Sequence, residues 1–466
     1  MKKIICYELN EVPWKVIEFY IKNRRNSNLE KLLKKSRKFT SHTKDKGELH
    51  PWSTWPTMHR GVCNTSHDIN FLNQDISVGK NFPPIWDILI NSNKTVGIFG
   101  SLQSGSPIIH ENIKFHIPDT FSSSHNTKPK KYESFQKLNL NLTNRNKAIA
   151  SKINISDMID ALKLFRNGLT LKSSVLTLKH LFHEFLNKHS KSLRPTIQAV
   201  IAFDIFKHCL KNTKPDFVTF FTNHVAGIMH RYWKYSFPED FNYELSNSKF
   251  DKYHKKSILR AMDIADAQIN YLMKFARKNN YDIVVCSSMG QEAINRGEYV
   301  PEIKLEDFKS LKKLIKFDSS VKLKMAMQPD IVFEFECRQD LDSFIKKMTS
   351  IKDTKQKPIF EVRYPPKNLT LNLKTIHSKI LSKNSTIIFN GENHSLRKAG
   401  FSTFKRDIGT GYHQPYGIII WNKNNHKGYT SKEKTTIDSR SLAPTILNAL
   451  DVNIPKYMKK PISLNH

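Results

Sequence analysis

Short apolar runs alternate along the chain with longer stretches in which apolar residues recur at helical spacing. This alternation predicts a mostly parallel sheet covered by helices, an α/β fold arranged as a three-layer α/β/α sandwich. The apolar runs predict strands at Ile4–Tyr7, Thr95–Phe99, Phe217–Phe221, Ile283–Cys286, Thr386–Phe389 and Gly417–Trp421. The helical spacing predicts helices at about Val12–Lys35, Pro84–Asn91, Ile155–Asn187, Arg194–Leu210 and Lys256–Lys278.

Two segments interrupt this alternation. Residues 122–210 combine a polar loop with helical spacing, which predicts a loop and helical insertion. Residues 330–385 contain short apolar runs around one helical stretch, which predicts a small α+β insertion. The main fold is therefore expected to comprise residues 1–121, 211–329 and 386–466.

Composition limits the class of protein. The chain has 466 residues, of which 39% are hydrophobic and 11% aromatic, so a sizeable core can be buried and a disordered protein is excluded. It lacks an apolar run of about 18 residues, so no membrane span is expected. The start, MKKIICYELN, does not resemble a signal peptide, and the five cysteines include no close pair. These features predict a cytoplasmic protein.

The charge is strongly positive. Lysine and arginine number 75 against 42 acidic residues, a formal net charge of +33, which attracts phosphate, sulfate, nucleic acid or anionic lipid. The lysines are spread out, and the chain carries no RNA-binding or zinc-finger pattern. Compositional drift explains the charge better than nucleic-acid binding does, and nucleic acid is not a clear partner.

Polar residues follow several of the predicted strands. Glu8 follows the first strand, His224 follows Phe217–Phe221, and Ser288 follows Ile283–Cys286. Because the carboxyl ends of parallel strands meet at one edge of a sheet, we expect these groups to lie together where α/β proteins bind ligands. His230 lies six residues after His224, so a regular helix would not place both on one face.

Five segments then carry a resemblance to the alkaline phosphatase superfamily, in its type I phosphodiesterase/nucleotide pyrophosphatase branch. They are STWPTMH (Ser53–His59), TSHDINFLNQD (Thr65–Asp75), PPIWDILINSNKTVGIFGSLQSGS (Pro83–Ser106), ILRAMDIADAQINYLMKFARKNNYDIVVCSSMG (Ile258–Gly290) and DSRSLAPTILNALDVNIPKYMKKP (Asp438–Pro461). They occur in the order found in that superfamily. The resemblance implies a metal-dependent hydrolase or transferase acting on phosphoric or sulfuric esters.

The resemblance also assigns roles to residues. It places the nucleophile of the superfamily on Thr54, and the three ligands of one metal on His224, His230 and His413. Three imidazoles suit zinc with an open fourth position. The alternatives are that Thr54 only caps a helix, as Ser53 or Thr57 could, and that His230 is an ordinary partly buried histidine. Asn73 lies near the substrate-binding asparagine of the superfamily, or is a plain loop residue.

The second metal site departs from the pattern. Glu8 stands where the superfamily has its first aspartate, but Ser288 and Met289 replace an aspartate–histidine pair. A hydroxyl and a thioether are poor ligands for zinc, so Glu8 and Thr54, with Asn10 and Glu292, could hold a second ion only weakly. The resemblance thus implies one tight divalent site and an anionic ester substrate. The alternative is a catalytically degenerate protein that binds an anionic ligand.

Overall fold

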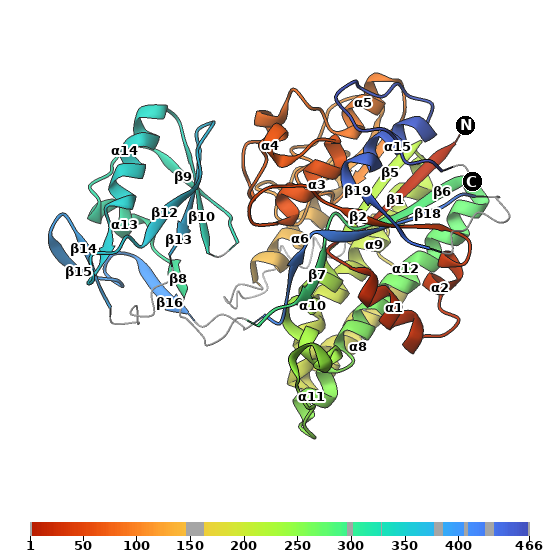
Figure 1. Cartoon of the computed structure of the whole chain (residues 1–466), viewed down its shortest axis with the longest axis horizontal. Helices are drawn as coiled ribbons and strands as arrows, with labels where there is room; N and C mark the ends of the chain where they lie inside the picture. Colours follow the sequence, from red (N-terminus) through yellow and green to blue (C-terminus); the bar gives the residue numbers. More distant parts are fainter. Residues whose placement is uncertain are drawn as a thin grey trace. The chain divides into compact units, whose positions relative to one another are not determined.

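The computed structural model describes residues 2–145, 163–295, 302–327, 329–376, 385–404, 409–424 and 433–464. The first residues of the predicted helix Ile155–Asn187, up to 162, lie outside these ranges. The chain forms two compact units (Figure 1). The larger unit comprises Met1–Asp68, Gly79–Asn295 and Gly409–His466, and the smaller comprises Ile69–Val78 and Arg296–Ile408.

An eight-stranded, mostly parallel sheet forms the middle layer of the larger unit. Its order is β19-β2-β18-β6-β1-β5-β3-β4, and β18 runs antiparallel to both of its neighbours. The strands are β1 (Lys3–Leu9), β2 (Arg37–His42), β3 (Val96–Phe99), β4 (Ile113–Ile117), β5 (Phe217–Thr222), β6 (Tyr281–Cys286), β18 (Tyr416–Asn422) and β19 (Thr435–Asp438). Five of the six predicted strands lie in this sheet.

Helices cover both faces of the sheet, which confirms the three-layer α/β/α sandwich (Figure 1). One face carries α1 (Trp14–Asn23), α2 (Asn28–Leu33), α9 (Arg194–Thr213), α10 (His224–Ser236) and α12 (Ser257–Asn279). The other carries α3 (Pro51–Arg60), α4 (Asn64–His67), α5 (Ile85–Asn91) and α15 (Leu442–Ala449). The helix α6 (Glu133–Arg145) packs on β3 through Phe135 and Phe99, whereas α8 (Leu171–Leu186) and α11 (Lys249–His254) pack against other helices. Within the described ranges, no helix combines the length and hydropathy needed to cross a bilayer.

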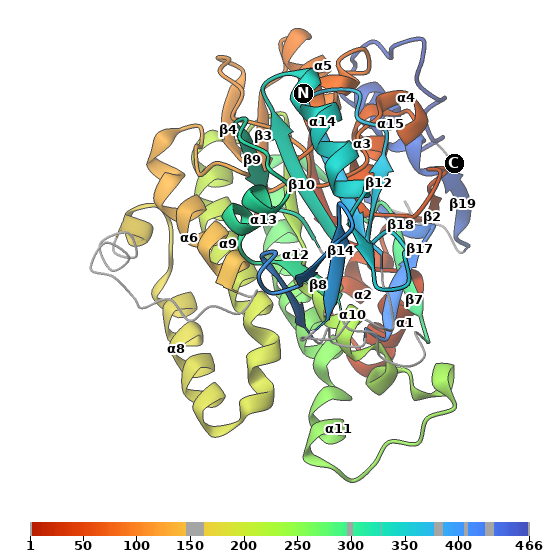
Figure 2. The same ribbon diagram turned by 90° about the vertical axis from the view of Figure 1, so that its left-hand side faces the viewer.

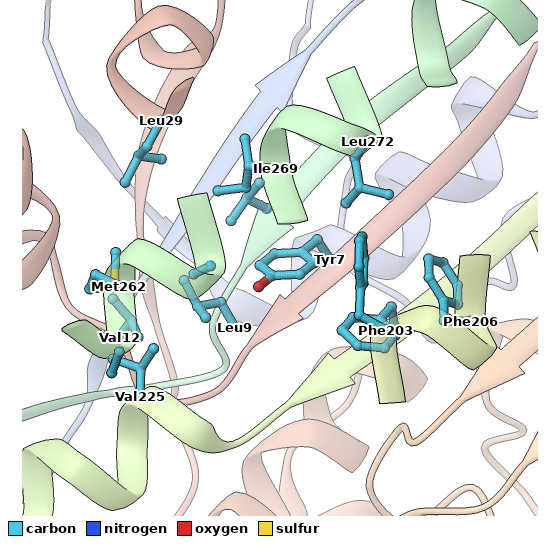
Figure 3. Packing of buried hydrophobic residues seen from close by; sticks show 14 of the residues in the cluster. Tyr7, Leu9, Val12, Leu29, Phe203, Phe206, Val225, Met262, Ile269 and Leu272 are labelled. Carbon is cyan, nitrogen blue, oxygen red and sulfur yellow. The ribbon is translucent and has the colours of Figure 1, made fainter. Parts of the chain in front are cut away.

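The core between the sheet and the first helical layer is aromatic and aliphatic (Figure 3). Tyr7 of β1 lies among side chains of α9 and α12, including Phe203 and Leu272, all buried. Its hydroxyl donates to Gln268 Oε1 at 2.6 Å, and Gln268 Nε2 donates to the Ala199 carbonyl oxygen. Both buried polar side chains therefore have hydrogen-bond partners, and these bonds connect β1 to α12 and α9.

Two predicted elements differ in the structure. The helix predicted at Val12–Lys35 is broken into α1 and α2, because Asn26 adopts a left-handed conformation and Ser27 caps a new helix. Ser27 accepts from the Glu30 amide, and the Glu30 side chain accepts from the Asn26 amide, a variant of the capping box. The strand Thr386–Phe389 is found, but it lies in the smaller unit instead of the main sheet.

The smaller unit is α+β. A four-stranded antiparallel sheet, β12-β13-β10-β9, packs with α14 (Arg338–Thr349) and α13 (Phe308–Leu314) around its own core. These strands are β9 (Val321–Lys324), β10 (Asp330–Phe335), β12 (Phe360–Tyr364) and β13 (Thr370–Thr375). The remaining strands are β8 (Glu302–Leu305), β11 (Lys352–Asp353), β14 (Thr386–Phe389), β15 (Glu392–Ser395) and β16 (Phe401–Phe404). The predicted insertion 330–385 lies within this unit. An Asn390-Gly391 turn joins β14 to β15, which explains why that strand pairs locally.

The packing of Gly97 in β3 generates a stability prediction. A Cβ at Gly97 would lie 2.4 Å from Cζ of the fully buried Phe115, so Gly97→Ala should lower the free energy of unfolding by about 1–3 kcal/mol. Gly227 in α10 has no atom within 4 Å of such a Cβ, so Gly227→Ala should be neutral or stabilising. Urea unfolding of both variants measures the difference, and equal effects would contradict this packing.

Candidate metal centre and active site

Two imidazoles and one carboxylate converge where β1 ends. His230 Nε2 lies 2.9 Å from Glu11 Oε2, and His413 Nε2 lies 3.5 Å from the same oxygen. His230 belongs to α10, and His413 to β17 (Gly411–Gln414), which pairs with β7 (Gly290–Ala293). In the described part of the chain, no other three His, Cys, Asp or Glu side chains converge as closely.

Both imidazoles are oriented by backbone carbonyls. His230 Nδ1 donates to the Gly411 carbonyl oxygen at 2.9 Å, and His413 Nδ1 donates to that of Leu49 at 2.7 Å. A carbonyl oxygen can only accept, so Nδ1 carries the proton in each ring and, in the neutral ring, Nε2 keeps its lone pair. This is the arrangement that fixes metal-binding histidines in proteins. Nε2 of each ring faces Glu11, so it donates to the carboxylate when the ring is protonated and offers a lone pair to a metal ion when the ring is neutral.

Glu11 occupies an unusual backbone conformation. Its φ is +60°, a left-handed value that is uncommon for a residue other than glycine, and the residue is only 2% exposed. Asn10 Nδ2 donates to Glu11 Oε1 at 2.8 Å, and Gln291 Nε2 donates to Oε2. A strained and fully partnered carboxylate of this kind is typical of functional sites.

The two histidines favour the ionised form of the Glu11 carboxyl by lowering its pKa. Burial raises the pKa of the Glu11 carboxyl, but the positive charges of His413 and His230 and their hydrogen bonds outweigh it. The pKa therefore lies well below its usual value, and Glu11 stays ionised. One carboxylate with two imidazoles is a donor set that catalytic zinc accepts, with a position left for water or substrate. The residues present thus fit a divalent transition metal.

Thr54 lies in the first turns of α3. The helix begins at Pro51, where a missing N–H costs no hydrogen bond, and Thr54 is fully buried. Thr54 Oγ1 lies 2.8 Å from Ser288 Oγ, directly after β6, and either hydroxyl can donate. The structure therefore brings the predicted nucleophile to the edge of the sheet that carries Glu11.

Hydrogen bonds join α3 to the three-residue cluster at two points. Trp55 Nε1 donates to Asn10 Oδ1 at 2.7 Å, and Asn10 in turn donates to Glu11. The Leu49 carbonyl that orients His413 lies two residues before α3. The helix that carries Thr54 and the cluster are thus positioned by the same contacts.

Glu8 has partners other than the cluster. Its Oε1 lies 2.7 Å from His59 Nε2, its Oε2 accepts from Ser101 Oγ at 2.8 Å, and all three side chains are buried. His59 Nδ1 is buried without a hydrogen-bond partner in the described structure. Among the described residues, only His59 accompanies Glu8 as a strong ligand type, so this pair falls short of a complete metal site.

The structure does not bring His224 to the cluster, which differs from its predicted role as a ligand. Thr222 Oγ1 lies 2.7 Å from His224 Nδ1, and His224 Nε2 donates to the Ala261 carbonyl oxygen at 3.0 Å. Both ring nitrogens are therefore occupied. Asn73 belongs to the smaller unit, where its Nδ2 donates to the Met325 carbonyl oxygen.

Sequence reasoning missed Glu11 and His59. Glu11 follows Glu8 by three residues in the turn after the first strand, and its only signal was an acidic residue at that strand end. His59 appears in the sequence as one of several histidines without ligand spacing. Its place one turn after Trp55 on α3, against which its ring stacks, is visible only in three dimensions.

The buried state of His224 predicts an acid-sensitive fold. Burial lowers its pKa to about 4, while the hydrogen bond to Ala261 opposes this. Between the ordinary value of about 6.5 and 4, the unfolded chain binds the extra proton, so stability falls as the pH falls, by up to about 1.4 kcal/mol per pH unit. His224→Gln should reduce that slope by about one proton in urea unfolding at pH 4–7. An unchanged slope would show that His224 titrates normally.

Comparison with known proteins gives matches in structure only. No protein-family model matches the chain, and no curated protein matches it in sequence. Among solved structures, murine ectonucleotide pyrophosphatase/phosphodiesterase 5 has 10% identity and a TM-score of 0.40, covering 98% of this chain and 97% of that one. Wild-type alkaline phosphatase PafA has 10% identity and a TM-score of 0.45, covering 99% and 98%.

A third solved structure is phosphonoacetate hydrolase from Sinorhizobium meliloti 1021 in complex with phosphonoformate. It has 10% identity and a TM-score of 0.38, covering 96% of this chain and 95% of that one. The chain is similar to these three proteins in fold alone.

Proposed function

We propose that this protein is a metal-dependent hydrolase or transferase that acts on phosphoric or sulfuric esters through Thr54. One observation carries the proposal. Two imidazoles, each fixed through Nδ1, direct Nε2 at the buried carboxylate of Glu11, beside the helix that presents Thr54. The metal ligands are Glu11, His230 and His413, so Glu11 takes the place first assigned to His224.

The donor set favours a divalent ion such as zinc. Bound there, the ion would act as a Lewis acid toward an ester oxygen and a nearby hydroxyl. The high positive charge of the chain favours an anionic substrate. All five cysteines are free thiols, which supports a cytoplasmic location as part of the proposal.

Thr54 would perform the covalent step. Its Oγ forms a bond to phosphorus or sulfur and loses its proton, while the bond to the leaving oxygen breaks and that oxygen takes up a proton and departs as the alcohol. Water or a second alcohol later resolves the threonyl ester. Ser288 Oγ, at 2.8 Å, orients the hydroxyl of Thr54. The hydrogen bonds from Trp55 to Asn10 and from Asn10 to Glu11 fix the position of α3 relative to Glu11. The nucleophile on α3 is therefore held in place.

A second candidate is a degenerate protein that binds an anionic ligand without turnover. The observation in its favour is the pairing of Glu8 with His59 and Ser101, which leaves a hydroxyl, Ser288, as the neighbour of Thr54. A two-metal site would hold the leaving oxygen more strongly than one ion does. If the protein is an enzyme, it should therefore favour esters with good leaving groups.

Metal analysis tests the ligand set. We expect one tightly held ion per chain. Loss of a supporting residue around a metal costs about 10–100-fold in affinity, so Glu11→Gln and His413→Ala should each cost at least about 100-fold. Plasma mass spectrometry after dialysis against a weak chelator measures the occupancy.

His224→Gln is the matched control, because glutamine can keep both hydrogen bonds of His224, and it should retain the ion. Two tightly bound ions in the wild type would reveal ligands outside this cluster. Loss of the ion in His224→Gln, with Glu11→Gln unaffected, would contradict the ligand set.

Substitution of Thr54 separates the enzyme from the binder. On a panel of phosphomonoester, phosphodiester and sulfate-ester substrates, Thr54→Ala should lower kcat by at least about 1000-fold with ligand affinity kept, because the nucleophile forms its bond only along the reaction path. Thr54→Ser should retain partial activity. Thr57→Ala is the control, because it removes a threonine hydroxyl from the same helix that already has other partners. Thr57 Oγ1 donates to Asp45 Oδ1 at 2.6 Å and lies 2.9 Å from His67 Nε2.

Thr57→Ala should lower the stability and leave kcat near that of the wild type. If the wild type and Thr54→Ala are equally inert on every ester but bind an anionic ligand alike, the degenerate binder replaces the enzyme.

A further inference from the structure

Helix α8 lies at the periphery of the larger unit (Figure 2), and it exposes an apolar face. Its apolar residues recur at alternating spacings of four and three, which places them on one side of the helix. They are strongly exposed, with Leu171 at 77%, Leu178 at 65%, Phe182 at 65% and Phe185 at 85%. Val175, Leu181 and Leu186 extend the face, at 48%, 51% and 67%. We call these seven residues the apolar face of α8.

Polar contacts fix the opposite side of α8 on the protein. The Thr170 amide and hydroxyl donate to Asp204 of α9, the hydroxyl at 2.7 Å, and Ser173, one turn on, is buried. At the other end of the helix, Arg194 Nη2 donates to the buried Glu184 at 2.8 Å. The helix is therefore held through its polar side, with its apolar face outward, the reverse of the usual arrangement in a globular protein.

A contiguous apolar face of this kind marks an interaction surface. Its occupant is indicated by the charges around it. Between residues 163 and 194 the chain has five lysines, two arginines and one acidic residue. That acidic residue, Glu184, is buried and paired with Arg194, whereas Lys172, Lys179 and Lys188 are exposed. Within residues 163–194, the charged side chains that are exposed and not paired with an acid are therefore all positive.

This charge pattern favours an anionic lipid surface over a second copy of the chain as the partner of the apolar face of α8. A second copy of the chain on the same face would bring the exposed lysines of two helices together, which is unfavourable. An anionic lipid surface would instead pair with them, while Leu and Phe side chains enter the acyl region. Apolar residues on one face with lysines beside them are the pattern of helices that lie in a membrane interface.

We propose that α8 docks the protein on an anionic phospholipid surface. The apolar face of α8 enters the boundary between headgroups and acyl chains, and Lys172 and Lys179 contact lipid phosphates. The proposal is independent of the ester chemistry proposed for Thr54, because no residue of that site lies on α8.

Sedimentation with lipid vesicles tests the proposal, with the full chain as protein. The wild type should bind vesicles of phosphatidylglycerol and phosphatidylcholine, and bind pure phosphatidylcholine at least about tenfold more weakly, because Lys172 and Lys179 near an anionic surface contribute about fivefold each. Phe182→Ser with Phe185→Ser should abolish binding. Lys172→Glu with Lys179→Glu should remove the preference for anionic vesicles.

Ile109→Ser is the matched control, since Ile109 is 93% exposed in the same unit but lies outside α8. It should bind vesicles as the wild type does. Thermal unfolding should show that all variants are folded, which the exposure of the substituted side chains favours.

Three results would overturn the proposal. One is vesicle binding that is equal for the wild type and the Phe182/Phe185 variant. Another is a dimer in sedimentation velocity that dissociates in that variant, which would make a second copy the occupant. The third is a monomer that binds no vesicles, which would leave another occupant, such as residues 146–162, for the apolar face of α8.

Discussion

The buried ionised carboxylate of Glu11 is the constraint on which the rest of the site depends. A charge removed from water is unfavourable unless cations and donors surround it, and Glu11 is only 2% exposed. The groups that satisfy it come from four parts of the chain: the turn after β1, helix α10, strand β7 and strand β17. These elements must therefore meet at one place for the carboxylate to be tolerated, and the left-handed backbone at Glu11 aims it there.

The same constraint explains the separation of two carboxylates at this edge of the sheet. Glu8, in β1 itself, is paired with His59 and Ser101, while Glu11, in the following turn, is paired with His230 and His413. Each acid thus has its own imidazole partners, and Asn10 lies between them with hydrogen bonds to Trp55 and Asn223. The three-residue cluster at Glu11 and the incomplete pair at Glu8 are the reason that we propose a single ion instead of two.

Much of the fold follows from the hydrophobic pattern, because buried parallel strands are continuous apolar runs and their covering helices are amphipathic. The resemblance indicated His230 and His413 as candidate ligands, and the structure brings both to Glu11, which the sequence did not indicate. The choice between His224 and Glu11 depends on helix phase. His224 begins α10, and His230 lies six residues on, at about 240° around the helix. His224 consequently faces Ala261 of α12 while His230 faces Glu11. Such a phase relation appears only once the helix is known to be regular between the two residues.

The central claim is that Glu11, His230 and His413 hold the metal ion, and anomalous diffraction tests it most directly. Crystals grown with Zn²⁺ would be measured at wavelengths above and below the zinc absorption edge. The account predicts one strong anomalous peak about 2 Å from Glu11 Oε2, His230 Nε2 and His413 Nε2. A peak on Glu8 and His59, or on His224, with none at Glu11, would contradict it.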